Sequence, residues 1–329
     1  MPFRLVLDPT DEPLFRLRQD EAGTPAPSPL STATVVAQEI AAGRLTAAVW
    51  APSGGPESGL ALWHRSMVRV SKVLTLWLAP DLRSAAAYMA LILEVVGTGG
   101  PERVVTLPDH AAGLEERDLG AIVRPLGFEH VGRVRLAAAV ESFPPAVLPE
   151  GVSLRAAGPP DRLSLIDLFE RAYGKDADVL FGATLDPATD ARDYLDMEIF
   201  GKPAWDRAAS FVAVEGDRPV GSVLVQRTEA GPLVADLMVD PGRRGRGLGA
   251  ALLAAVADAL RARGETTMSL TLTPRNPSGA GHLYRRLGFV EVTDAGRRPG
   301  GLWVRTSFLR EGGFRLLPEP GETPCQAGG

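Results

Sequence analysis

Short runs of apolar residues separated by polar turns recur along this chain, and one ordered series extends from Leu233 to Gly264. Leu233 to Val239 is an apolar, partly β-branched run that predicts one buried strand. Asp240-Pro241-Gly242 interrupts this run. Apolar residues then recur at helical spacing at Leu252, Leu253, Val256 and Leu260. The pattern therefore predicts a strand, a turn and a helix in direct succession.

The same criteria predict further elements on both sides of this series. In the first part of the chain we expect strands at 3–7, 46–51, 60–67, 73–78 and 103–107, and helices at 32–42 and 82–96. In the second part we expect strands at 152–156, 210–214, 220–226, 266–272, near 290 and at 302–309, and helices at 161–173, 185–200 and 278–287. Strands and helices alternate, which predicts a mixed α/β (α+β) fold.

The turn that precedes the helix reads Arg243-Arg244-Gly245-Arg246-Gly247-Leu248-Gly249. The first turn of a helix leaves N–H groups without intrahelical partners, and the peptide dipoles place partial positive charge there. Glycines let a phosphate approach the backbone closely, and arginines add a charge that does not titrate away. The turn therefore predicts an anion-binding site at the start of the helix.

Three other interpretations of this turn fit the sequence less well. A solvated Gly/Arg loop would not need a strand before it and a helix after it. Gly245, Gly247 and Ala250 satisfy the dinucleotide pattern G-x-G-x-x-A, but five residues separate Val239 from Gly245, and the next strand ends in Thr-Pro instead of an acidic residue. The Gly-Lys-Ser/Thr of a phosphate-binding P-loop is absent from the sequence.

The first half of the chain repeats the second at a nearly constant offset. Pro241 follows Pro80 by 161 residues, and the Leu-Gly-Phe at 287–289 follows that at 126–128 by the same number. The chemistry is not repeated, because the first half reads Arg83-Ser-Ala-Ala-Ala-Tyr88 where the second has its glycines. We therefore predict a degenerate domain at 1–145, an anion-binding domain at 146–311 and a flexible tail at 312–329.

Length and composition limit the function classes. A chain of 329 residues predicts two domains, and a net charge of −5 argues against a general nucleic-acid partner. The single cysteine, Cys325, provides no disulfide framework or thiolate metal cluster. An acidic N-terminus without an apolar leader, and a longest apolar run of 85–93, favour a cytoplasmic protein without a membrane segment.

Two sequence signatures point to a family. Arg244-x-x-Gly247-x-Gly249, after a strand that ends Val-Asp-Pro, resembles the acetyl-CoA pyrophosphate loop of the GCN5-related N-acetyltransferases, the GNAT superfamily. The segment from Asn276 to Phe289, which carries Tyr284 shortly before Gly-Phe, resembles a second signature of the same family. The resemblance is strong over residues 151–310 and architectural before them. It implies two tandem GNAT-like domains, each with a mixed, largely antiparallel twisted sheet flanked by helices.

The resemblance also implies which residues bind acetyl-CoA, the expected co-substrate. The backbone of the central strand would hold the pantetheine arm, and the glycine turn would hold the pyrophosphate. The residues implied are Leu237, Met238, Val239, Arg244, Gly245, Arg246, Gly247, Leu248, Gly249, Ala250 and Asn276. The side chains of the strand residues also fit a role in the core, and Asn276 also fits the start of a helix. No metal is expected.

Tyr284 and Asp236 are the predicted catalytic residues. By resemblance, Tyr284 would donate a proton to the departing CoA thiolate, although its position on an amphipathic helix also fits a core aromatic. Asp236, or a water molecule that it orients, would deprotonate the incoming ammonium. In a regularly alternating strand its side chain would point away from Ala235 and Leu237, toward polar surroundings or a cleft.

The acceptor would be a primary amine of a small molecule, bound by a protein that is a monomer or a homodimer. The segment from Tyr173 to Phe200 is acidic and aromatic, which suits a cationic amine, although charge runs are usually solvated surface. The acidic residues in question are Asp176, Asp178, Asp186, Asp190, Asp193, Asp196 and Glu198. Alternatives are a mycothiol-synthase-like acetyltransferase, an enzyme that acylates protein N-termini, or a non-catalytic acyl-CoA-binding or regulatory protein.

Overall fold

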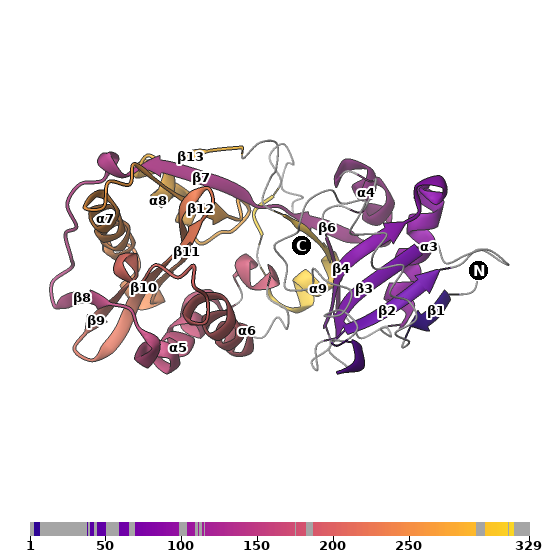
Figure 1. Ribbon diagram of the computed structural model, residues 1–329, viewed down its shortest axis with the longest axis horizontal. Helices are drawn as coiled ribbons and strands as arrows, with labels where there is room; N and C mark the ends of the chain where they lie inside the picture. The colour runs from indigo at the N-terminus through magenta and orange to yellow at the C-terminus, as the bar shows by residue number, and fades with distance from the viewer. Residues whose placement is uncertain are drawn as a thin grey trace, which may run out of the picture. The chain divides into compact units, whose positions relative to one another are not determined.

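The computed structural model of the chain describes most of the second half and the regular elements of the first (Figure 1). The described residues are 3–6, 38, 40–42, 45–50, 59–65, 70–98, 104–108, 111, 114, 116–174, 176–181, 187–293, 300–314 and 316–318. The helix expected at 32–42 and most of the tail expected at 312–329 therefore fall largely outside the described residues.

The chain divides into two compact units, each of which takes one segment from beyond the predicted boundary. Residues 1–131 and 300–312 form the first unit, and residues 132–299 and 313–329 form the second. The sequence prediction places the boundary near residue 145. The structure differs because residues 132–145 lie with the second unit and residues 300–312 with the first.

The first unit contains a seven-stranded sheet in the order β1-β2-β3-β4-β5-β14-β6. Its strands are β1 (Phe3–Val6), β2 (Leu45–Trp50), β3 (Gly59–Arg65), β4 (Val70–Leu78), β5 (Val104–Pro108), β6 (Phe128–Val131) and β14 (Leu302–Arg305). Its α-helices are α3 (Ala85–Thr98), α4 (Glu116–Val123) and α9 (Thr306–Glu311). All neighbouring strands are antiparallel except β4 and β5.

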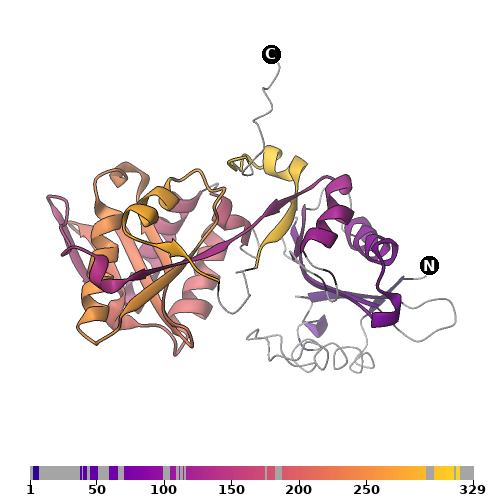
Figure 2. The same ribbon diagram turned by 90° about the horizontal axis from the view of Figure 1, so that it is seen from above.

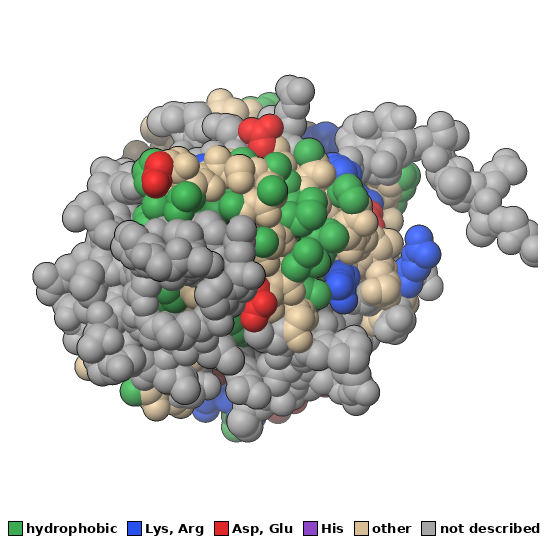
Figure 3. All heavy atoms as spheres, turned by 90° about the vertical axis from the view of Figure 1, so that its right-hand side faces the viewer, with side chains coloured by type: hydrophobic (Ala, Val, Ile, Leu, Met, Phe, Trp, Pro, Cys, Tyr) green, Lys and Arg blue, Asp and Glu red, His purple; other side chains and the backbone are tan. Residues whose placement is uncertain are grey.

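The core of the first unit lies between one face of this sheet and helices α3 and α4. Tyr88, Leu91 and Ile92 of α3 pack against Leu76 and Leu78 of β4. Figure 3 views the right-hand side of Figure 1, where β1 to β4 and α3 lie, and shows hydrophobic side chains gathered among the described residues of that face. The apolar face of α3 therefore packs against the sheet.

The second unit contains a sheet in the order β13-β7-β12-β11-β10-β9-β8. Its strands are β7 (Val134–Ala139), β8 (Val152–Ala156), β9 (Phe211–Glu215), β10 (Arg218–Thr228), β11 (Gly231–Val239), β12 (Thr267–Leu272) and β13 (Val290–Glu291). Its helices are α5 (Arg162–Tyr173), α6 (Pro187–Asp193), the π-helical turn η7 (Tyr194–Phe200), α7 (Leu248–Arg261) and α8 (Ala280–Arg286).

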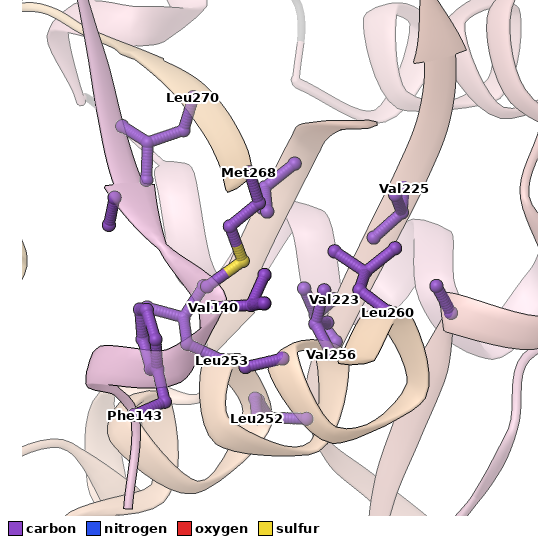
Figure 4. Close-up of a cluster of buried hydrophobic side chains, with 14 of the residues drawn as sticks. Val140, Phe143, Val223, Val225, Leu252, Leu253, Val256, Leu260, Met268 and Leu270 are labelled. Carbon is purple, nitrogen blue, oxygen red and sulfur yellow. The ribbon is translucent and has the colours of Figure 1, made fainter. Parts of the chain in front are cut away.

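Helices cover both faces of this sheet. On one face, α7 packs Leu252, Leu253 and Val256 against Val223 and Val225 of β10 (Figure 4). On the other face, Leu165 and Leu168 of α5 share a cluster with Leu224 of β10 and Met238 of β11. Neighbouring residues of β10 therefore serve opposite cores, as the period-two geometry of a strand requires.

Each unit receives one strand from the other half of the sequence. β7 follows β6 along the chain but pairs with β12 and β13 in the second sheet, whereas β14 pairs with β5 and β6 in the first. In Figure 2, β7 can be followed by its magenta colour into the sheet of orange strands. The strand expected at 302–309 is β14 only as far as Arg305, because α9 begins at Thr306.

The predicted internal repeat is confirmed in three dimensions. When one sheet is read in reverse, the two strand orders correspond, with β14 in the place of β7. A bulge interrupts β3–β4 pairing between Leu62 and Trp63, and an equivalent bulge interrupts β10–β11 pairing between Leu224 and Val225. The fold therefore consists of two corresponding mixed sheets in tandem, as expected from the sequence.

Candidate functional site

The site lies where the two parallel strands of the second sheet separate. β11 and β12 are paired only at Leu233–Ser269 and Val234–Leu270, so from residue 235 onward β11 has no partner strand on that side. A cavity of about 590 Å³ occupies this region. Leu237, Val239, Leu270 and Leu272 line it. The opening thus exposes one edge of β11 to a ligand that can form strand-like hydrogen bonds.

The glycine turn lines part of this cavity. Gly245 and Gly247 have φ values of +74° and +83°, a left-handed conformation that favours glycine, and Gly247 immediately precedes α7. No backbone or side-chain acceptor among the described residues receives the amide N–H groups of residues 245–250. The turn therefore presents six donors at the positive end of a helix, which is the arrangement that binds phosphate.

Gly249 is required for a different reason. A Cβ atom at this position would lie 3.1 Å from Cδ2 of Leu283, so the glycine allows α7 and α8 to approach each other closely. Gly245, Gly247, Leu248, Gly249 and Ala250 line the cavity. Arg246 is exposed and is not among the lining residues, and the side chain of Met238 belongs to the core.

Arg244 stabilises the turn through its side chain. Its Nε donates to the carbonyl of Val239 at 3.3 Å, and its Nη2 donates to the carbonyl of Ala172 at the end of α5. The guanidinium thus ties the end of β11 to α5. A contact from Arg244 to a pyrophosphate stays a prediction. The turn gains further support from Asp240, whose carboxylate accepts from the amide of Gly242 at 3.0 Å and from Arg171 at 3.0 Å.

Asp236 reaches the cavity because β11 is not a regular strand. In the bulge, Leu224 pairs with Asp236 and Val225 with Val234, which leaves Ala235 as an extra residue. Ala235 packs in the α5 cluster, and Asp236 accepts a 2.6 Å hydrogen bond from Tyr173 Oη of α5. The expected alternation is therefore wrong only for Ala235, which the bulge places on the same side as Asp236, whereas Leu237 packs on the opposite side and Asp236 lines the cavity.

Burial raises the pKa of Asp236 to about 7, and the negative charge of Asp178 adds to this rise. The hydrogen bond from Tyr173 and the positive charge of Arg133 act in the opposite direction. A carboxyl group with such a pKa changes its protonation state near neutral pH, which is the range in which a general base works best.

Tyr284 lines the same cavity from α8. Its ring packs edge-on against Phe289 with centroids 5.6 Å apart. Burial raises the pKa of the Tyr284 hydroxyl, and the charges of Asp178, Asp236 and Asp176 raise it further. The hydroxyl therefore keeps its proton at neutral pH, and it can donate that proton to a base formed in the cavity.

Asn276 connects this region to two carboxylates. Its Nδ2 donates to Asp176 and, at 3.1 Å, to Asp178 Oδ2, while its Oδ1 accepts from the amide of Ser278 at 2.9 Å. Helix α8 begins later, at Ala280, so Asn276 caps a turn and not the helix. Because its side chain is already engaged, direct contact between Asn276 and the co-substrate stays a prediction.

Sequence reasoning assigned the acidic segment mainly to solvated surface, but part of it lines the cavity. Asp176, Asp178 and Asp190 are lining residues, and Thr273 Oγ1 donates to Asp178 Oδ1 at 2.5 Å. Burial raises the pKa of Asp176 to about 6, and the charge of Asp178 raises it further. In contrast, Asp196 forms a surface ion pair with Arg162.

Arg133, Tyr173 and Tyr194 complete the lining on the side of Asp236. Sequence analysis assigned no role to Arg133, because this residue lies before the predicted boundary at residue 145. Within the described part of the chain, no group of three His, Cys, Asp or Glu side chains is placed to hold a metal ion. The same residues include no helix with the length and apolar character needed to cross a membrane.

Comparison with known proteins agrees with the fold. A family model described as an acetyltransferase (GNAT) domain matches residues 206–291, which include β11, the glycine turn, α7 and Tyr284. A search of curated proteins finds no match to the chain.

Several solved structures share the architecture across nearly the whole chain. A GCN5-related N-acetyltransferase from Sphaerobacter thermophilus is 22% identical, with 92% of this chain and 93% of that chain covered and a TM-score of 0.52. A tandem GNAT protein from the clavulanic acid biosynthesis pathway is 16% identical, with 92% and 96% covered and a TM-score of 0.53. A probable N-acyltransferase from Enterococcus faecalis V583 is 9% identical, with 94% and 74% covered and a TM-score of 0.58.

These findings establish the fold of the chain and a family match within its second unit. Residues 206–291 of the second unit match the GNAT domain model, and the fold of the chain is similar to that of tandem GNAT proteins. At these identities the solved structures establish the fold, and the residues of the cavity must carry any conclusion about the reaction.

Proposed function

We propose that the second unit is an N-acetyltransferase that transfers the acetyl group of acetyl-CoA to a primary amine of a small molecule. The proposal rests on one observation, namely that three features lie in the same cavity. These are six free amide donors at the start of α7, a buried carboxyl with a pKa of about 7, and a protonated buried tyrosine.

The residues fit acetyl-CoA at two separate places. Amides 245–250 have no acceptor among the described residues, and a pyrophosphate offers several anionic oxygens to such donors. The unpaired edge of β11 at residues 235–239 offers N–H and C=O groups to the amide-bearing pantetheine arm. When bound, acetyl-CoA supplies an activated thioester, so the protein needs only to place the amine and to move two protons.

Asp236 and Tyr284 are suited to those proton transfers. An ammonium ion cannot attack a carbonyl carbon, so Asp236, directly or through water, would accept a proton from the acceptor. Tyr284 would donate its proton to sulfur as the thiolate departs. Two groups with such different pKa values in one cavity favour an enzyme over a non-catalytic acyl-CoA-binding protein.

The first experiment tests acetyl-CoA binding by calorimetry. Gly247→Trp places a bulky side chain where the anion is expected, and nothing lies within 4 Å of a Cβ at that position. Because φ at Gly247 is +83°, this substitution also strains the backbone. Gly264→Trp is the matched control, since Gly264 has a φ of +78° and equally open surroundings after α7.

We expect the wild type and Gly264→Trp to bind acetyl-CoA and Gly247→Trp not to bind it. A panel of small primary amines then tests transfer, with release of free CoA thiol as the readout. Absence of acetyl-CoA binding by the wild type would refute the proposal.

A further inference from the structure

Arg133 is a positively charged group that the proposed reaction does not use. It precedes β7, lines the cavity, and places its guanidinium 4.7 Å from the ring centroid of Phe181. Among the described residues it forms no hydrogen bond or ion pair, and its buried Nε has no partner. A buried donor without an acceptor is costly, so a site that maintains one is prepared for a ligand.

The hydroxyl of Tyr194 is a second unsatisfied donor in the same part of the cavity. It is buried and has no hydrogen-bond partner among the described residues. Burial raises the pKa of Tyr194, Asp236 raises it further, and Arg133 lowers it. Arg133 and Tyr194 are therefore within electrostatic range of each other and of Asp236.

Asp236 does not neutralise Arg133 by direct contact. The Asp236 carboxylate is held by Tyr173, with 2.6 Å between Tyr173 Oη and Asp236 Oδ1. The cavity thus presents a proton acceptor and, separately, two free donors. A guanidinium and a phenol together match the two oxygens of a carboxylate, which accepts charge-assisted hydrogen bonds.

We propose that the acceptor is an amino carboxylate, such as a free amino acid, whose carboxylate binds Arg133 and Tyr194 while its amine faces Asp236. This inference rests on the proposed acetyl transfer and specifies its substrate class. The pairing of β7 with the second sheet then has a functional consequence, because Arg133 directly precedes β7 and lines the cavity.

The test is binding to the CoA-loaded protein, which does not depend on turnover. Calorimetry compares the L-amino acids, β-alanine and 4-aminobutyrate with their carboxamides and with the corresponding amines that lack the carboxylate. We expect at least one amino carboxylate to bind roughly 10- to 100-fold more tightly than its carboxamide, the range expected for charge-assisted hydrogen bonds.

Two variants test the assigned donors. Arg133→Met removes the charge but keeps an apolar chain beside Phe181, and Tyr194→Phe removes only the hydroxyl. Each should reduce the preference for the carboxylate while binding of the uncharged analogue stays nearly unchanged. Arg135→Met is the control, because Arg135 lies on β7, donates to Ser269 Oγ at 3.0 Å and is not a lining residue.

The outcomes separate this inference from the proposed function. Equal binding of acids and carboxamides, no binding of any panel member, or a preference that survives Arg133→Met would overturn the inference. A preference that depends on Arg133 without acetyl transfer to any bound compound would support the amino-carboxylate site and refute the transferase. Transfer to amines without a carboxylate preference would do the reverse.

Discussion

The two units share one architecture and differ where the strand leads into the helix. In the first unit, Arg83 Nε donates to the carbonyl of Leu78 at 3.0 Å. In the second, Arg244 Nε donates to the carbonyl of Val239 at 3.3 Å, and both members of this pair lie 161 residues later. An arginine therefore donates to the last carbonyl of the equivalent strand in both units, which indicates that this contact stabilises the fold.

The two units differ in the segment that connects the central strand to the helix after it, and in how the first turn of that helix is capped. Residues 79–84 connect β4 to α3, whereas the longer segment 240–247 connects β11 to α7. Ser84 Oγ accepts from the amide of Ala87 at 3.2 Å, so the first unit caps its helix with its own side chain. The second unit has Gly247 at this position and leaves the amides free. The same fold therefore either caps this helix start with a side chain or leaves its amides open to the anion that we propose, according to a few residues.

The largest expected effect comes from removing β7, the strand that precedes the predicted boundary but pairs in the second sheet. Leu136 and Ala138 of β7 are buried in the core of the second unit, and β7 pairs with β12 from Thr267 to Leu272. The predicted domain 146–311 lacks this strand and retains β14, whose partners lie in the first sheet. We expect fragment 146–311 to show no cooperative thermal transition by circular dichroism.

Fragment 132–299 is the control for this prediction, because it contains every strand of the second sheet. It should fold and bind acetyl-CoA. Cooperative folding of 146–311 with a stability equal to that of 132–299 would show that β7 is dispensable and would contradict the prediction.

The helix starts can be compared by removing Gly245 and Arg246, which gives the second unit a connection as short as that of the first. The deletion removes part of the amide array, and we expect acetyl-CoA affinity measured by calorimetry to fall at least about 100-fold, since hydrogen bonds to charged groups contribute roughly 1.5–3 kcal/mol each. Ser84→Ala is the reciprocal change. It should lower the free energy of unfolding by about 1 kcal/mol without affecting affinity. Unchanged affinity in the deletion variant would refute the role of the turn.

One buried tyrosine from each unit can be replaced to test whether only that of the second unit takes part in the reaction. Tyr284→Phe removes the proposed proton donor and keeps the ring beside Phe289, so we expect kcat to fall roughly 10²- to 10⁴-fold with little change in acetyl-CoA binding. Tyr88→Phe alters a fully buried tyrosine of α3 in the first unit and should leave kcat unchanged. Steady-state kinetics on both variants checks this, and a fully active Tyr284→Phe would exclude Tyr284 as the acid.

The pKa of Asp236 predicts the pH dependence of the rate. Since the carboxylate form must accept the proton, kcat/KM should rise about tenfold per pH unit below pH 7 and level off above it. Asp236→Asn should abolish this limb of the profile. A kcat/KM that does not change between about pH 5 and about pH 8 would contradict the assignment of Asp236 as the base.

The same pKa predicts a smaller effect on stability. Folding raises the pKa of Asp236 from 3.8 to about 7, so its contribution is fully favourable below about pH 4 and is lost as the pH rises through 7. Asp236→Asn stays neutral and can still accept from Tyr173. The difference in unfolding free energy between variant and wild type should therefore grow with pH, by up to about 4 kcal/mol at pH 8. A difference independent of pH would contradict this.

Local sequence patterns predicted the parts of the site that are contiguous in the chain. The glycines of the turn, the following helix and Tyr284 before Gly-Phe could be located because each depends on residues only a few positions apart. The repeat was also visible, since its offset is the same at Pro80 and at the Leu-Gly-Phe of residue 126.

Nonlocal packing decided the rest. Strand pairing depends on partners far away in sequence, so no local pattern could show that β7 and β14 exchange sheets. A bulge is defined by two strands together, which is why the sequence did not show that Ala235 and Asp236 lie on the same side of the sheet. Residues close together in the chain were sufficient to predict two repeated folds and a glycine turn at the start of a helix. Only the tertiary structure brought Arg133, Tyr194 and Asp236 into one cavity, because burial and electrostatic contact depend on spatial distance and not on position along the chain.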